Sequence, residues 1–193
     1  MKKLSGLLIV VIILALAALW GVKSYNGLVQ KDEAVQSAWG QVENTYQRRA
    51  DLIPNLVATV KGYAEHEKET LEEVVAARAK ATQTTVKDLS ETSVAEFQKA
   101  QSQLSGALSR LIAVVESYPD LKANANFMDL QAQLEGTENR INEDRRNFNE
   151  VAQGYNTAVR SFPANIIASL FHFDKKGYFT ADEGAAQAPK VEF

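Results

Sequence analysis

An uncharged run near the N-terminus constrains this chain more than any other feature. Leu4–Val22 contains no charged side chain and is rich in Leu, Ile, Val and Ala. As a helix rising about 1.5 Å per residue, the run matches the ~30 Å hydrocarbon core of a bilayer. Trp20 and Tyr25 lie where an aromatic belt forms, and Lys23 follows the run. The sequence therefore predicts an N-terminal transmembrane helix.

Two other interpretations of this run stay open. Ala15-Leu16-Ala17 is similar to the small-residue cleavage site of a secretory signal peptide. The apolar character continues past that site to Val22, which favours an uncleaved anchor. A buried core helix would need protein on every side of so apolar a segment.

The flanking charges bear on orientation. Lys2, Lys3 and the terminal amine precede the run, while Lys23 and Lys31 follow it. Because basic residues close to a membrane helix favour the cytoplasmic side, the small excess at the N-terminus favours an extracytoplasmic body. The sequence thus predicts a single-pass protein of the cell membrane, and a cytoplasmic body stays open.

Composition excludes several classes of function. The formal net charge of −3 is a poor match for a nucleic-acid phosphate backbone, so we expect no nucleic-acid partner. The chain has no cysteine, which rules out disulfides, thiolate zinc sites, iron–sulfur clusters and cysteine nucleophiles. With only 10 Gly and 4 Pro, the sequence favours long uninterrupted elements.

Bulky side chains recur every seven residues through the body, which is helical and not strand spacing. The rows in the first segment are Leu28, Val35, Val42, Arg49, Leu56, Tyr63 and Trp39, Tyr46, Ile53, Val60. The rows in the last segment are Phe127, Leu134, Ile141, Phe148, Tyr155, Phe162 and Leu130, Thr137, Asp144, Val151, Ala158. We therefore expect an all-α fold, an antiparallel bundle of long helices.

Local signals suggest where the helices begin and end. Between Asp51 and Pro54 we expect either a kink or a helix–turn–helix break, because proline removes a helical hydrogen bond. Ser93 and Glu96 have the spacing of a capping box. The last long helix is expected to start near Asn126.

After the last long helix the chain changes character. Phe171 and Phe179 bracket a turn-like cluster, residues 174–177, and small residues from Gly184 onward predict a flexible tail. The predicted organisation is a basic N-terminus (1–3), a transmembrane anchor (4–22), a helical bundle (23–170), and an aromatic turn with a flexible tail (171–193).

Two features of the body are candidate sites. Arg49 lies in the apolar seam of the first segment and Asp144 in that of the last, so we predict that they meet as a buried polar layer that fixes register. The alternative is that helix rotation or a kink at Pro54 carries both to the surface.

The C-terminus is the second candidate. Val191, Glu192 and Phe193 place apolar side chains at alternating positions before the terminal carboxylate. Domains that bind C-terminal peptides add them as an edge strand and hold the carboxylate with backbone N–H groups. The alternatives are fraying and docking on the protein's own surface.

We find no residue set that suggests catalysis. His66-Glu67 begins a zinc-protease motif, but Thr70 stands where the second histidine is required. The Glu-x-x-His pairs of di-iron bundles are missing. The acidic run Glu65–Glu73 is typical of a solvated helix face. We therefore expect no enzyme activity, cofactor or metal.

With these residues in view, the chain resembles the LemA family of bacterial membrane proteins over nearly its whole length. The matching strings are Tyr25-Asn26, Leu28-Val29, Ala38-Trp39, Arg48-Arg49-Ala50-Asp51-Leu52-Ile53-Pro54-Asn55-Leu56-Val57, Tyr63-Ala64, His66-Glu67, Ala77-Arg78, Tyr118-Pro119, Leu121-Lys122, Asn126-Phe127, Leu130-Gln131, Thr137-Glu138-Asn139, Tyr155-Asn156 and Pro189-Lys190-Val191. Phe148 stands where the family often has Tyr. The resemblance implies a membrane-anchored four-helix bundle and carries no enzymatic role.

The functional expectation is a membrane-tethered interaction or scaffold protein of the bacterial envelope. It would contact the bilayer and bind other membrane or envelope proteins through a helical face and its C-terminal tail. The alternative is a structural or bilayer-sensing protein that acts by self-association, so a homo-oligomer stays open.

Overall fold

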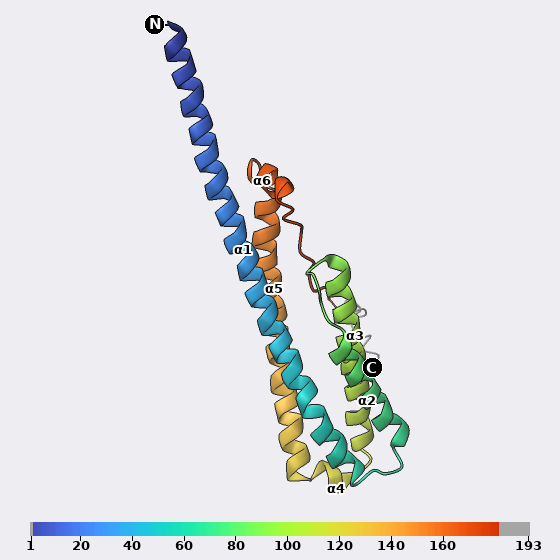
Figure 1. The fold of residues 1–193 in the computed structure, drawn as a ribbon. Helices are drawn as coiled ribbons and strands as arrows, with labels where there is room; N and C mark the ends of the chain where they lie inside the picture. The colour runs from blue at the N-terminus through green and yellow to red at the C-terminus, as the bar shows by residue number, and fades with distance from the viewer. Residues whose placement is uncertain (1, 182–193) are drawn as a thin grey trace, which may run out of the picture.

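The computed structural model describes residues 2–181, with side chains from residue 8 onward. Over these residues every regular element is a helix and no strand occurs, which confirms the predicted all-α fold (Figure 1). The elements are α1 (Lys2–Lys61), α2 (Lys68–Gln83), α3 (Glu91–Val115), α4 (Pro119–Lys122), α5 (Ala125–Arg160) and α6 (Ala164–Leu170).

Helix α1 carries both the apolar N-terminal run and the first long element of the body. It has 60 residues, which span about 90 Å as an α-helix. The side chains of residues 8–20 are all exposed, and Figure 1 shows this end projecting beyond the other helices. Full burial begins at Leu28. One continuous backbone therefore joins the predicted anchor to the body.

Pro54 lies inside α1 without ending it. Its neighbours Ile53 and Leu56 stay in the apolar seam with 0% and 1% exposure, so the predicted alternative of a turn at this point is wrong. Proline has no N–H to donate to the carbonyl four residues earlier, which belongs to Ala50. Arg78 of α2 donates its Nε–H to that oxygen at 2.7 Å. The proline thus creates an acceptor on α1 that binds α2.

The body is built from antiparallel pairs. Helix α1 packs along α5, α2 packs along α3, and α2 also contacts α1 (Figure 1). Short α4 joins α3 to α5 at the end of the body far from the N-terminus, and α6 lies at the opposite end beside α1. The predicted antiparallel bundle matches this arrangement.

The N-terminus of α3 lies three residues earlier than the sequence predicts. Ser90 is the cap, and its Oγ accepts from the backbone N–H of Ser93 at 3.3 Å. Asp88 accepts from the Ser90 N–H at 3.1 Å and the Ser93 hydroxyl at 2.8 Å. Hydrogen bonding to the side chains of Ser90 and Ser93, and then to the Ser90 N–H, lowers the pKa of Asp88. The predicted box of Ser93 and Glu96 is therefore wrong, because Ser93 already serves the preceding cap.

Two apolar clusters fill the body. The proximal cluster, nearer the apolar run, is Leu28, Val35, Ala38, Trp39, Val42, Tyr46, Leu89, Val94, Phe97, Ile141, Phe148, Ala152, Tyr155, Val159, Ala168 and Phe179. The distal cluster is Ile53, Leu56, Val60, Ala64, Leu71, Val74, Ala81, Leu104, Ala107, Leu108, Leu111, Val115, Leu121, Phe127 and Leu134. Most side chains of the seven-residue rows are thus buried. Leu130, Val151 and Ala158 are half-buried against the clusters, whereas Tyr63 and Phe162, past the ends of α1 and α5, are exposed.

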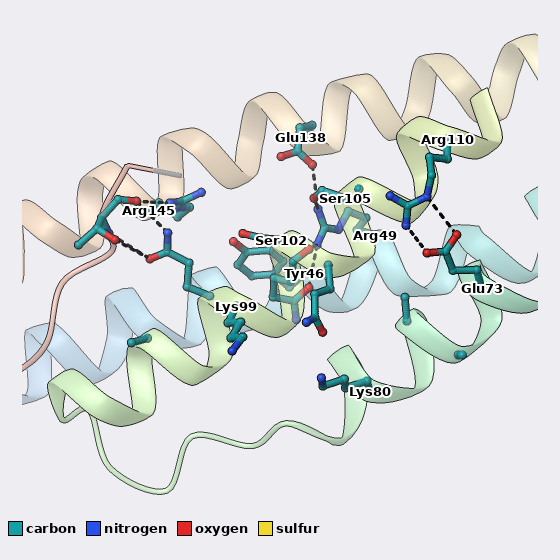
Figure 2. A pocket seen from close by; sticks show the side chains of 18 of the residues that line it. Tyr46, Arg49, Glu73, Lys80, Lys99, Ser102, Ser105, Arg110, Glu138 and Arg145 are labelled. Atoms are coloured by element: carbon teal, nitrogen blue, oxygen red, sulfur yellow. Dashed lines mark hydrogen bonds and ion pairs between the residues drawn. The ribbon is translucent and has the colours of Figure 1, made fainter. Parts of the chain in front are cut away.

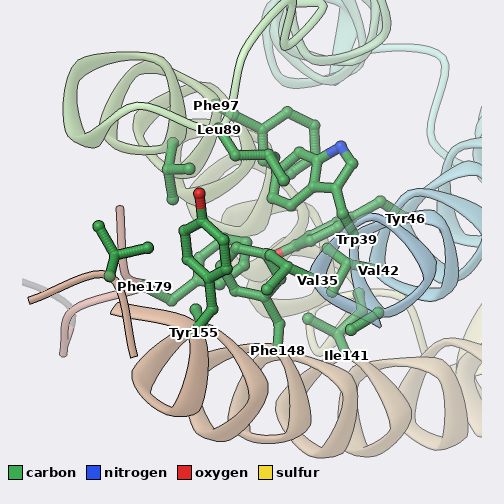
Figure 3. Close-up of a cluster of buried hydrophobic side chains, with 14 of the residues drawn as sticks. Val35, Trp39, Val42, Tyr46, Leu89, Phe97, Ile141, Phe148, Tyr155 and Phe179 are labelled. Carbon is green, nitrogen blue, oxygen red and sulfur yellow. The ribbon is translucent and has the colours of Figure 1, made fainter. Parts of the chain in front are cut away.

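The proximal cluster is organised around an indole ring (Figure 3). The Trp39 ring centroid lies 5.1 Å from that of Phe97 and 5.4 Å from that of Phe148, both edge to face, and stacks on Phe179 at 5.8 Å. No residue of α2 belongs to this cluster. Phe179, from the segment after α6, fills the position that a fourth helix would occupy.

We call this segment, residues 171–181, the C-terminal strap. Three side-chain amides each bond both the N–H and the C=O of one strap residue, at 2.8–3.0 Å. The pairs are Gln98 with Thr180, Asn149 with Phe179, and Asn156 with Lys176. This reciprocal pairing satisfies the strap backbone as a neighbouring strand would. The strap thus fastens α3 to α5.

The predicted turn at residues 174–177 is wrong, because these residues of the strap form no turn. At its centre the Gly177 N–H donates to the Leu89 carbonyl at 2.7 Å. The Lys176 ammonium lies 2.7 Å from Asp32 of α1 and over the ring of Tyr155. Burial, followed by the charge of Asp32, raises the pKa of Tyr155. The predicted flexible tail from Gly184 lies outside the described residues.

We expect Arg78 and Pro54 to be energetically coupled. Arg78→Met leaves the Ala50 carbonyl without a partner and should lower the unfolding free energy by about 1–3 kcal/mol. In a Pro54→Ala background the residue-54 N–H bonds that carbonyl, so Arg78→Met should cost clearly less. Urea unfolding of the full chain in detergent gives the double-mutant cycle. Arg110→Met, at a surface ion pair, is the control; equal costs of Arg78→Met in both backgrounds would contradict the coupling.

The strap predicts a steric effect at Gly177. A Cβ there would lie 2.7 Å from the Glu91 Cα, so Gly177→Ala must displace backbone and should cost about 1–3 kcal/mol of unfolding free energy. Gly154→Ala meets open space on α5 and should gain up to about 1 kcal/mol from helix propensity. Chemical denaturation measures both; no loss at Gly177 would show that the strap is not held closely.

Candidate functional site

Arg49 lies on α1 between the two apolar clusters, and its side chain is 2% exposed. Nη1 donates to Ser105 Oγ at 2.7 Å and to Glu138 Oε2 at 3.0 Å. Nη2 donates to Gln101 Oε1 at 2.7 Å and to the backbone oxygen of the same residue at 3.3 Å. The guanidinium carbon lies 5.0 Å from the centre of the Tyr46 ring. These contacts join α1 to α3 and α5.

We call Arg49, Gln101, Ser105 and Glu138 the arginine layer. A guanidinium stays charged at any pH a protein survives, so its burial must be compensated by hydrogen bonds and an opposite charge. Glu138 supplies the charge while remaining half exposed, and Gln101 is buried. Arg49 Nε has no hydrogen-bond partner among the described residues. The guanidinium is therefore held through its two Nη atoms, which donate all four of its hydrogen bonds.

The structure buries both members of the predicted polar layer but does not bring them together. Asp144 accepts from the Thr45 hydroxyl at 2.6 Å and lies 3.8 Å from Arg140 Nε on its own helix. Glu138 and Asp144 are six residues apart on α5, or about 9 Å along the axis. Arg49 is level with Glu138, so the predicted pairing with Asp144 is replaced by two polar contacts between α1 and α5.

A groove with a volume of about 1130 Å³ opens beside the arginine layer. Residues of α1, α2, α3, α5 and the strap line it. Figure 2 shows Arg49 at its centre, with Arg145 toward one end and Arg110 toward the other. On α3 the lining extends from Ala95 to Arg110, or about 22 Å along the helix. The groove is long and open, unlike a closed pocket for a small molecule.

The lining of the groove is basic although the chain is acidic. Five of its side chains are Arg or Lys and two are Glu, whereas the formal net charge of the chain is −3. Both glutamates are paired, Glu138 with Arg49 and Glu73 with Arg110. Lys80 and Lys99 are exposed at its edge. Among the lining residues that the structure describes, positive charges therefore outnumber negative ones, and Lys80 and Lys99 present theirs to solvent.

The remaining predicted site residues lie elsewhere. Asp51 is exposed and accepts from Gln47 Nε2 at 2.7 Å on the same helix. Val191, Glu192 and Phe193 are outside the described residues. His66 and His172 are both exposed, and no group of three His, Cys, Asp or Glu suited to a metal occurs in the part of the chain that the structure describes.

We expect the buried hydrogen bonds of Arg49 to contribute more to the unfolding free energy than its ion pair with Glu138. Arg49→Ala removes four hydrogen bonds and leaves a cavity, and should lower the unfolding free energy by about 2–4 kcal/mol. Glu138→Gln should cost less than about 1 kcal/mol, because a half-exposed carboxylate is already hydrated. Urea unfolding in detergent compares the two. An equal loss in both variants would mean that the ion pair, and not the buried hydrogen bonds, holds the layer.

Comparison with known proteins gives the chain a family. Protein LemA of Metamycoplasma hominis is 26% identical over 82% of this chain and 69% of its own length. Magnetosome protein MamQ of Magnetospirillum gryphiswaldense is 32% identical over 42% of this chain and 29% of its own length; MamQ 2 of Paramagnetospirillum magneticum matches with the same identity and coverage. Proteins of the LemA family are membrane-associated. The family pattern matches residues 38–193, and the chain therefore belongs to the LemA family.

Proposed function

We propose that this chain is a non-enzymatic, membrane-tethered binding protein of the bacterial envelope. In this proposal the apolar run of α1 crosses the membrane once, and the groove beside the arginine layer receives an acidic segment of another membrane or envelope protein. The proposal keeps the extracytoplasmic body that the flanking charges of the run predict.

The composition and exposure of α1 support the tether. Within the described residues α1 is the one helix long and apolar enough to span a bilayer, with a mean hydropathy of 2.2 in its most apolar window. None of that window is buried inside the protein. An apolar helix that the chain itself leaves uncovered needs another apolar environment, and lipid supplies it.

The basic lining of the groove is the observation that carries the binding proposal. Lysine and arginine side chains along about 22 Å of helix suit an extended or helical acidic segment better than a compact ligand. Arg49 is buried and its Nη atoms are already bonded within the protein, so the exposed ammonium groups of Lys80 and Lys99 would meet the partner's carboxylates. The names of the relatives, protein LemA and magnetosome protein MamQ, state no reaction.

Site-specific crosslinking tests the proposal. A photoreactive amino acid at Gln103, which lines the groove, should crosslink discrete partner proteins in native membranes. Lys80→Glu with Lys99→Glu reverses two exposed charges at the groove edge and should abolish most of these crosslinks. The matched control is Arg48→Glu with Arg146→Glu, two exposed arginines outside the groove lining, which should leave the crosslinks unchanged.

Each other outcome decides against part of the proposal. Equal loss of crosslinks in both double variants would mean that bulk charge, and not the groove, attracts the partner. Crosslinks between copies of this chain alone would replace the proposal with the self-associating alternative. Protease accessibility in the same membranes reports the side that holds the body.

The C-terminal tail stays a prediction as a second binding element. Deleting Val191–Phe193 should reduce the set of proteins that co-purify with the chain, whereas the crosslinks from position 103 in the groove should persist. If the same proteins are recovered after the deletion, the tail takes no part in recognition.

A further inference from the structure

Exposed apolar side chains cluster at the end of the body that lies beside the apolar run of α1. Beyond the apolar run, from residue 26 to 181, the large hydrophobic residues that are exposed are Tyr63, Val75, Met128, Phe162, Ile166, Leu170, Phe171 and Tyr178. Half of them lie within ten residues at and around α6. We call Phe162, Ile166, Leu170 and Phe171 the α6 patch; their exposures are 82%, 56%, 68% and 52%.

The opposite side of α6 is packed against the protein. Ala168 is buried in the proximal cluster and Ile167 packs on its edge, whereas Ile166 and Leu170, four residues apart, share the outer face. Residues 161–171 contain no charged side chain. The uncovered face of helix α6 is therefore uncharged and carries the exposed side chains of Ile166 and Leu170 beside those of Asn165 and Ser169.

The position of α6 along α1 indicates the surroundings of the uncovered face of α6. Ile167 Cδ1 lies 3.8 Å from the position of a Cβ on Gly21. The Phe171 ring contacts that of Tyr25 edge to face, with centroids 4.8 Å apart. Gly21 and Tyr25 flank the end of the uncharged run. The α6 patch is thus level with the point where α1 would leave the hydrocarbon.

We propose that the α6 patch inserts into the lipid interface as a second contact with the bilayer. The inference rests on the proposed tether, because it takes its depth from α1. The patch lies beside the end of the apolar run, and aromatic and aliphatic side chains at this depth are typical of helices that lie in the interface. Lys23 lies on α1 between Gly21 and Tyr25, and Arg160 precedes Phe162 by two residues; positive charges at this depth suit anionic headgroups. Two contacts fix the tilt of the body.

The absence of cysteine from the chain allows a direct test by fluorescence. Single variants Ile166→Cys and Leu170→Cys, each carrying an environment-sensitive nitrobenzoxadiazole label, are placed in nanodiscs of phosphatidylcholine and phosphatidylglycerol as full chains. Lipids with a spin label near the headgroup serve as quenchers for positions 166 and 170, and lipids with a spin label deep in the acyl chain serve for position 14. Val75→Cys and Met128→Cys, both 51% exposed on the body, are the controls, and Leu14→Cys reports the tether.

We expect blue-shifted, lipid-quenched emission at positions 166 and 170 and water-like, unquenched emission at both controls. Quenching at position 14 without quenching at 166 or 170 would overturn the inference and leave the tether intact. A lack of lipid quenching at all three positions would remove both. Blue-shifted emission at 166 and 170 without lipid quenching would mean that protein covers the patch, and would also overturn the inference.

Discussion

The burial of one guanidinium sets the geometry of this bundle. Apolar side chains tolerate small sliding of one helix past another, since their contacts have little direction. Hydrogen bonds do not, and Arg49 makes four of them to α3 and α5. With apolar clusters on both sides, displacing the helices would leave a charge in the core without partners. The arginine layer thus fixes the relative positions of three helices and leaves the groove beside them.

Continuity of α1 connects this layer to the apolar run. Arg49 follows the end of the apolar run by 27 residues, about 40 Å of helix. Pro54 does not interrupt the helix, because Arg78 of α2 bonds the carbonyl that the proline leaves free. In the proposed function, a rod of this kind would hold the basic groove at a defined distance from the bilayer, and the α6 patch would hold its tilt. Tether, layer and groove would then together present one binding surface.

The sequence was sufficient for the parts of the fold that depend on periodicity. Rows such as Phe127 to Tyr155 predict helix α5 and its buried face, because a seven-residue repeat has few other solutions. The sequence also identified Arg49 as a polar member of the α1 seam and Asp144 as a polar member of the α5 seam, and both are buried. Glu138 could not be identified as the partner of Arg49, since a pairing between helices depends on their relative rotation and rise.

The strap was beyond sequence reasoning for a related reason. Gln98, Asn149 and Asn156 are distant from the strap along the chain, and a side-chain amide on a helix gives no sign of which backbone it will bond. The free carbonyl of Ala50, by contrast, follows from Pro54 by the i−4 rule and could have been found. The identity of its donor could not.

The most direct test of the arginine layer is a distance measurement across the groove. Spin labels at cysteines replacing Gln103 on α3 and Asn142 on α5, both exposed, report the separation of those helices by pulsed electron paramagnetic resonance. We expect one narrow distance distribution in the otherwise native chain and a broad or displaced one after Arg49→Met. Identical distributions with and without Arg49 would show that the apolar clusters alone set the geometry, and would contradict this account.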